Sequence, residues 1–117
     1  MANNIPFQPM GKTVKLVASS NVSPNNAYMT ADSPVNQFCI VNHSSQPAYV
    51  WISPGTSPRN VALPTGSNSD ANYALVVDKN TRIVISGPQC SNSANVQVSV
   101  IAETDSPEVY ITPGEGF

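Results

Sequence analysis

The chain has 117 residues, of which 40% are hydrophobic, and this length and composition fit one domain with a modest core. It carries only 5 Lys and Arg and 7 Asp and Glu, with a net charge of -2. Because phosphate binding scales with the number of basic contacts, nucleic acid is not expected as a partner. No stretch approaches the roughly 20 apolar residues of a membrane helix, so we expect no membrane either.

The first residues also lack the basic and apolar blocks of a secretory signal. Residues 1–12, MANNIPFQPMGK, contain two prolines, a glycine and isolated apolar residues without a period, which predicts an extended arm. Beyond them, short apolar or alternating runs are separated by clusters of Asn, Ser, Pro and Gly. These runs predict strands at 13–18, 27–31, 37–42, 48–53, 73–77, 82–86, 95–104 and 108–112, with a further short strand at 60–63.

No window of 11 residues has a convincing helical period, so the prediction is an all-β chain of about eight strands. Short strands at intervals of about 8–12 residues are typical of sandwiches and small barrels. We predict a jelly-roll-like antiparallel β-sandwich over 13–112, with an extended N-terminal arm at 1–12 and a C-terminal tail at 113–117. An immunoglobulin-like sandwich is the alternative.

Residues that could carry chemistry are few and dispersed. The single histidine, His43, lies in a predicted turn, and nothing in the sequence links either cysteine to it. Glu103, Asp105 and Glu108 flank another predicted turn, where carboxylates are usually solvated. The run 67–72 alternates Asn and Asp like a calcium loop but lacks its glycine and glutamate, which predicts a plain polar loop. We therefore expect no enzymatic activity, no metal and no cofactor.

Two residue pairs leave alternatives open. Cys39 and Cys90 adjoin short apolar runs and are far apart in sequence, which favours buried free thiols, with a disulfide as the alternative. Tyr49 and Trp51 lie on one face of the predicted strand 48–53. Such pairs most often belong to the core, and a sugar-stacking platform is the alternative.

Both ends of the chain carry spaced apolar residues. Ile5, Phe7 and Met10 lie among prolines in the predicted arm, and Tyr110 and Phe117 lie in the C-terminal segment SPEVYITPGEGF. In extended segments, such side chains can anchor a protein on its neighbour. They can equally close the ends of their own domain.

At these residues the chain resembles a group of small proteins encoded near the major capsid gene of tailed bacteriophages. The resemblance rests on the opening MANNIPFQPMGKTVKL, the internal TADSPVNQFCIVN and the ending SPEVYITPGEGF. Some members of this group, in short-tailed phages, are similar to capsid cement or staple proteins with a jelly-roll-like fold. Those proteins bind the outside of the shell across capsomer boundaries, and the group has no catalytic residues to carry over.

The resemblance implies a virion protein that is made in the bacterial cytoplasm and decorates the outer surface of the capsid. Its partners would be the major capsid protein and itself, as a homodimer at twofold positions or, alternatively, a homotrimer at threefold ones. The capsid contacts would be Ile5, Phe7, Met10, Tyr110 and Phe117, which would clamp neighbouring subunits against the pressure of packaged DNA. The alternative is a virion-surface or head-fibre module that recognises a glycan or a host surface.

Overall fold

The computed structural model describes residues 7–18, 25–57, 59–63, 74–103 and 107–116. Within these ranges the chain forms nine β-strands and no helix, and so no helix able to span a membrane. The strands are β1 (Phe7–Pro9), β2 (Val14–Val17), β3 (Asn25–Met29), β4 (Val35–His43), β5 (Ala48–Pro54), β6 (Leu75–Val77), β7 (Thr81–Cys90), β8 (Val96–Ile101) and β9 (Glu108–Gly116).

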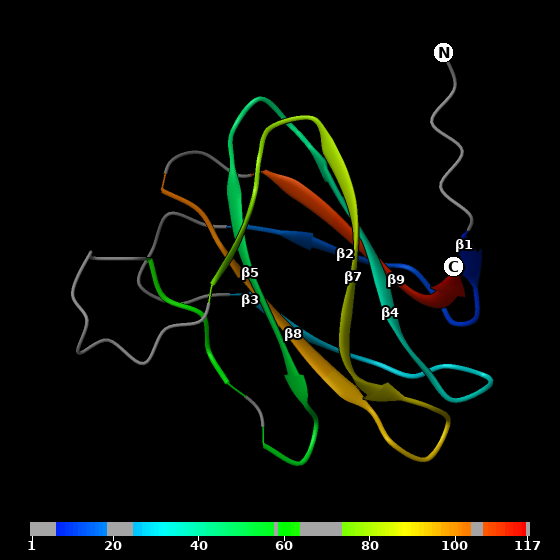
Figure 1. Cartoon of the computed structure of the whole chain (residues 1–117). Helices are drawn as coiled ribbons and strands as arrows, with labels where there is room; N and C mark the ends of the chain where they lie inside the picture. Colours follow the sequence, from blue (N-terminus) through cyan, green and yellow to red (C-terminus); the bar gives the residue numbers. More distant parts are fainter. Residues whose placement is uncertain (1–6, 19–24, 58, 64–73, 104–106, 117) are drawn as a thin grey trace.

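The strands form two antiparallel sheets that lie against one another (Figure 1). Sheet A has the order β1-β9-β4-β7, and β2 pairs with β9 alongside β1. Sheet B has the order β3-β8-β5-β6. The prediction of an all-β chain is confirmed, and the two antiparallel sheets are compatible with a β-sandwich.

The pairings are nested along the chain. β2 pairs with β9, β3 with β8, β4 with β7 and β5 with β6, all antiparallel. The chain therefore runs out through β2–β5 and returns through β6–β9, as one long hairpin would. Two further pairings, β4 with β9 and β5 with β8, close this hairpin into the two sheets.

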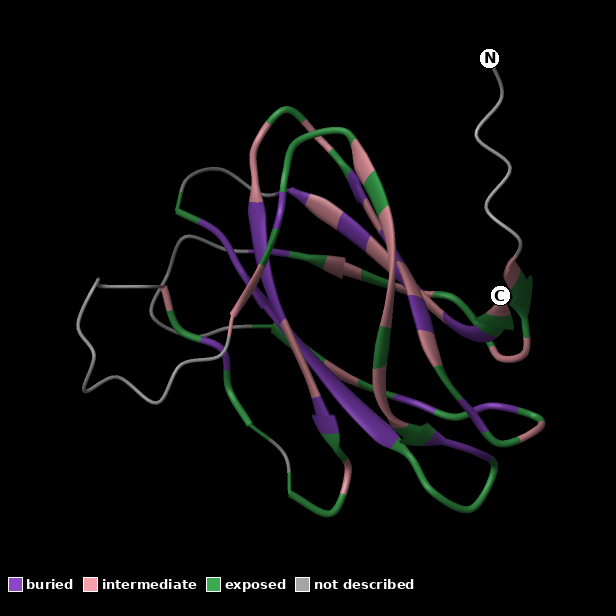
Figure 2. Ribbon diagram, viewed as in Figure 1, coloured by how far each residue is buried: buried purple, intermediate pink, exposed green. Residues whose placement is uncertain are grey.

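The core lies between the sheets, where alternate residues of each strand point inward. Figure 2 shows buried residues recurring along the strands of both sheets. From sheet A the largest contributors are Phe38 and Ile40 of β4 and Ile111 of β9, which are fully buried. From sheet B they are Val50, Val77, Val96, Val98 and Val100. Burial of each side chain of this size stabilises the folded state by about 1.5–3 kcal/mol.

A buried asparagine closes one end of the core. The Nδ2 group of Asn42, in β4, donates to the carbonyls of Gln46 at 2.7 Å, Val77 at 3.0 Å and Asp78 at 3.1 Å. Its Oδ1 atom accepts a hydrogen bond from the hydroxyl of Ser44 at 2.8 Å. One fully buried side chain thus ties the β4–β5 connection to the β6–β7 connection.

The element boundaries differ from the predictions mainly at the ends of the chain. β1 lies inside the segment 1–12 that was expected to be a separate arm, and β9 continues through 113–116, which was expected to be a tail. The segment 60–63 is not a strand, and β7 continues to Cys90 instead of ending at Ser86.

Proline explains why β9 was predicted to be too short. Pro113 lacks an N–H, which usually ends a strand within a sheet. In β9, however, it lies between the part that pairs with β2, ending at Ile111, and the part that pairs with β1, beginning at Gly114. Its carbonyl accepts a hydrogen bond from the N–H of Met10 at 2.9 Å, so the strand passes through the proline.

Candidate interaction surface

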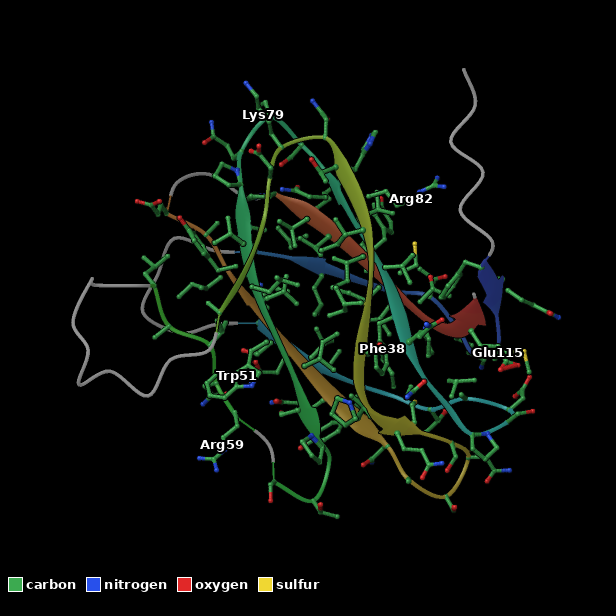
Figure 3. All side chains as sticks on the ribbon, in the orientation of Figure 1. Phe38, Trp51, Arg59, Lys79, Arg82 and Glu115 are labelled. Carbon is green, nitrogen blue, oxygen red and sulfur yellow. The ribbon has the colours of Figure 1, made fainter. Side chains whose placement is uncertain are left out.

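The two ends of the described chain meet at one corner of sheet A, which Glu115 marks in Figure 3. β1 pairs with the end of β9, with Phe7 opposite Gly116. The ring of Phe7 packs so closely that a β-carbon at Gly114 would come within 2.6 Å of its Cζ atom. The N–H of Gly116 donates to Oε1 of Gln37 at 2.6 Å, which ties this end of β9 to β4. We call this arrangement the β1–β9 corner.

Met10 is part of the fold. Its side chain is partly buried and packs against the main core, and its N–H bonds to Pro113 as described above. Two of the predicted capsid contacts, Phe7 and Met10, therefore make contacts within their own chain. Ile5 and Phe117 lie outside the described residues.

Tyr110 lies on the outer face of sheet A, away from the core. It stands opposite Lys15 of β2 and Val41 of β4, and Val41 stands opposite Arg82 of β7, so these side chains form a row across the sheet. The Nζ atom of Lys15 is 6.0 Å from the centroid of the Tyr110 ring and 3.4 Å from Oε2 of Glu108. Because both charged groups are about half exposed, this ion pair contributes less than about 1 kcal/mol.

The neighbouring row on this face carries no charge. Thr112 of β9 stands opposite Cys39 of β4, which stands opposite Val84 of β7. The hydroxyl of Thr13 lies 2.7 Å from that of Thr112, and Cys39 and Val84 are partly buried. The outer face of sheet A thus offers apolar and hydroxyl groups between Lys15 at one edge and Arg82 at the other.

Both cysteines are free thiols, as predicted, but of the two only Cys90 is buried as expected. Cys90 is buried, its thiol donates to the carbonyl of Met29 at 3.5 Å, and burial raises its pKa. Cys39 is only partly buried; burial raises its pKa, and the nearby charge of Arg82 lowers it by a smaller amount. A raised pKa keeps a thiol protonated and a poor nucleophile at neutral pH.

The middle of the outer face of sheet B is covered by the chain itself, whereas Tyr28 of β3 and Val76 of β6 remain exposed on this face. Segment 59–63 runs across it, where the N–H of Arg59 donates to Oγ of Ser53 at 3.1 Å and the N–H of Val61 donates to Oγ of Ser99 at 3.0 Å. β8 is consequently buried on both faces. This cover makes a second small core, which comprises Tyr49, Val61 and Ile101 with Trp51, Leu63 and Ala74 packed against it.

Tyr49 belongs to this second core, as the commoner reading of the Tyr49–Trp51 pair predicts. Its side chain is only 9% exposed, and its hydroxyl donates to Oε1 of Glu103 at 2.5 Å. The hydrogen bond to Glu103 raises the pKa of Tyr49, and burial raises it further. Tyr49 and Trp51 therefore do not form an exposed pair of rings, although Trp51, labelled on β5 in Figure 3, is itself partly exposed.

Sequence reasoning missed a cleft between the free edges of the two sheets. Its volume is about 340 Å³. β7 lies on one side of it and β5 with β6 on the other. The only hint of this cleft in the sequence is the run Ile83–Ile85, in which apolar residues do not alternate with polar ones. The lining residues are Val50, Trp51, Ile52, Leu75, Ile85, Ser86 and Gly87.

The residues considered for chemistry form no catalytic group. Glu103 accepts the hydrogen bond from Tyr49. His43, the exposed last residue of β4, stands opposite Glu108 of β9, and the carboxylate of Glu108 pairs with Lys15. Within the part of the chain that the structure describes, no group of three or more His, Cys, Asp and Glu side chains could hold a metal ion. Asp105 and the run 67–72 lie outside that part.

No protein-family model, no curated protein and no solved structure matches this chain.

Proposed function

We propose that this chain is a capsid decoration protein of a short-tailed bacteriophage. It would bind the outside of the head and clamp neighbouring major capsid subunits against the pressure of packaged DNA. The observation that carries the proposal is the β1–β9 corner. Phe7 and Gly116, the first and last residues that the structure describes, stand opposite one another there. We therefore expect both ends of the chain to contact the same neighbouring subunit. Many such copies on a symmetric shell would act together through effective concentration.

The nested strand order supports a jelly roll as the fold. Jelly rolls are eight-stranded antiparallel double sheets found in viral capsid and lectin domains. The nested antiparallel pairing of β2–β9 across the two sheets supports this proposal, because a long hairpin rolled into two sheets would pair its strands in this order. An immunoglobulin-like sandwich keeps three pairs of consecutive strands as neighbours in its sheets. Here β5 and β6 are the one consecutive pair of described strands that hydrogen-bond to each other.

The outer face of sheet A is the surface that we assign to the capsid. It is continuous with the β1–β9 corner through β9. It also carries the predicted contact Tyr110, whereas Met10 packs against the core and Phe7 packs against the end of β9. Sheet B is a poorer candidate because segment 59–63 covers the middle of its outer face. A mostly neutral face also lets many copies lie close together without mutual repulsion.

Recognition of a glycan or a host surface remains the alternative function, since lectins also use jelly rolls and a fold alone does not establish function. The burial of Tyr49 removes one of the two rings of the suggested stacking platform. We therefore rank this alternative second.

The test is co-sedimentation with capsids from a phage that lacks the gene. The protein should bind at saturating, symmetric stoichiometry, and particles without it should release their DNA at a lower temperature. Tyr110→Ala should weaken binding, whereas Tyr28→Ala, which alters an exposed tyrosine on sheet B, should not. Deleting residues 1–6 should weaken binding while leaving β1 in place. Failure of the wild-type protein to bind such capsids would refute the proposal.

A further inference from the structure

We propose that β7 pairs with the β7 strand of a second copy of this chain. The two strands would run antiparallel about a twofold axis at Val84, which would join the two copies of sheet A into one continuous sheet. This inference goes beyond capsid binding and does not depend on it.

The first argument is that β7 is an open edge. It pairs with β4 on one side and is the last strand of sheet A, so no described strand pairs with its other side. Within the described ranges, no backbone hydrogen bond from a turn or loop reaches the residues between Thr81 and Ser86. This stretch is in continuous register with β4 and contains no proline, lysine or bulge. Proteins usually protect an edge with such features, because its free N–H and C=O groups attract another strand.

The second argument is the cleft of about 340 Å³ beside this edge. Ile85 of β7 forms one wall, and Leu75 and Trp51 form part of the other. A strand added to β7 in the plane of sheet A would place its inward-facing side chains next to this cleft. Two aliphatic side chains of a second copy, Ile83 and Ile85, would thereby lose contact with water.

The third argument favours a second copy as the occupant, because the segment Thr81–Ser86 is complementary to itself. With Val84 opposite Val84 of the second copy, Ile83 stands opposite Ile85 and Arg82 opposite Ser86. Apolar side chains then meet on the inner face, and the only charge meets a hydroxyl group. Arg82 makes no ion pair within the described part of the chain, so its guanidinium is available to that hydroxyl. The two Arg82 residues lie four positions apart, about 13 Å along the strand, which avoids like-charge repulsion.

The first experiment measures oligomeric state by sedimentation velocity over a broad concentration range, without capsids. We expect a reversible dimer. Val84→Lys places two ammonium groups opposite one another at the axis and should weaken the dimer by about tenfold or more. The matched control is Val17→Lys, which makes the same change on the exposed opposite edge of sheet A and should leave the dimer intact. Circular dichroism would verify that both variants are folded.

The second experiment tests the register with disulfide cross-linking. Cys39 stands opposite Val84 within one chain, so it is first replaced by Ser. In that background Val84→Cys should form an intermolecular disulfide under mild oxidation, because directly opposed strand residues lie within disulfide range. Val17→Cys should not.

A monomer at every concentration would overturn the inference, as would a dimer that survives Val84→Lys or dissociates equally with Val17→Lys. If the wild-type protein is monomeric and Val84→Lys abolishes its binding to capsids, the edge of β7 binds the capsid protein instead and the inference fails. Because capsid binding is measured separately, neither result by itself decides the proposed function.

Discussion

Gly87 of β7 lies against the ring of Phe38 of β4. A β-carbon at position 87 would come within 2.9 Å of Cε2 of Phe38 and 3.2 Å of its Cδ2. Phe38 is fully buried at the centre of the core, so its ring has little room to retreat (Figure 3). The glycine therefore allows the edge strand to approach the core closely at the mouth of the cleft.

Gly87→Ala is expected to destabilise the domain by about 1–3 kcal/mol, because the added methyl group overpacks the core against Phe38. The free energy of unfolding, measured in urea, would show the change. Ser86→Ala is the matched control at the preceding exposed residue and should have little effect. Equal unfolding midpoints for the two variants would mean that the ring of Phe38 can move.

Gly114→Ala is expected to detach β1 from β9. The new methyl group would collide with the carbonyl oxygen of Gln8 and with the ring of Phe7. Hydrogen exchange should then become faster at the amides of β1 while the amides of β4 and β7 keep their protection. Glu115→Ala, at the exposed neighbouring residue, should leave β1 protected. Unchanged exchange in Gly114→Ala would show that β1 is not held at this corner.

Asn42→Ala is expected to lower the free energy of unfolding by about 3 kcal/mol. The substitution removes the donors to the carbonyls of Gln46, Val77 and Asp78, of which the contact to Val77 is buried, and it leaves a gap at a fully buried position. Chemical denaturation provides the measurement, with His43→Ala at the adjacent exposed residue as the control. A loss no greater than that of His43→Ala would contradict the role assigned to Asn42.

Tyr49 should make stability depend on pH in the alkaline range. Its pKa in the folded chain is raised above the ordinary value of 10.0 by the hydrogen bond to Glu103 and by burial. The folded state therefore holds this proton more tightly than the unfolded state. The resulting stabilisation is complete below pH 10.0 and is lost as the pH rises through the folded pKa.

The measurement is the melting temperature of the wild type and of Tyr49→Phe on both sides of pH 10.0. The wild type should lose more stability than the variant above that pH, and both cysteines remain present in each protein, so their own titration cancels. Parallel curves would show that the Tyr49–Glu103 contact does not favour the protonated tyrosine.

Much of the strand content of this chain could be read from local pattern. The alternation around Val14–Val17 and the apolar run Val96–Ile101 mark strands, because side chains of a strand point to opposite faces with a period of about two. The turn at Asp78–Asn80 was also predictable, and Asn80 adopts a positive φ of 49°, which asparagine tolerates. Pro113 misled the prediction because its missing N–H matters only where a neighbouring strand needs a donor.

The candidate surfaces could be predicted only in part. Spaced apolar residues drew attention to Phe7, Met10 and Tyr110, yet nothing local separates Met10, which packs against the core, from Tyr110, which faces outward. The cover over Tyr49 was equally hidden, because Val61 reaches Ser99 across 38 positions of sequence.

Residue pattern alone was sufficient for the β content of this chain and its shortage of charge. Those properties depend on composition and on neighbours within a few positions. Contacts between distant residues decide the rest: the pairing of the strands, the edge that stays open, and the glycines that lie against an aromatic ring. β7 is an edge because it is the last strand in the order of sheet A and, among the described strands, pairs with β4 alone. Gly114 is needed because Phe7, more than a hundred positions earlier in the sequence, folds back against it. Such contacts arise when the nested strands close around one core, which no local pattern specifies.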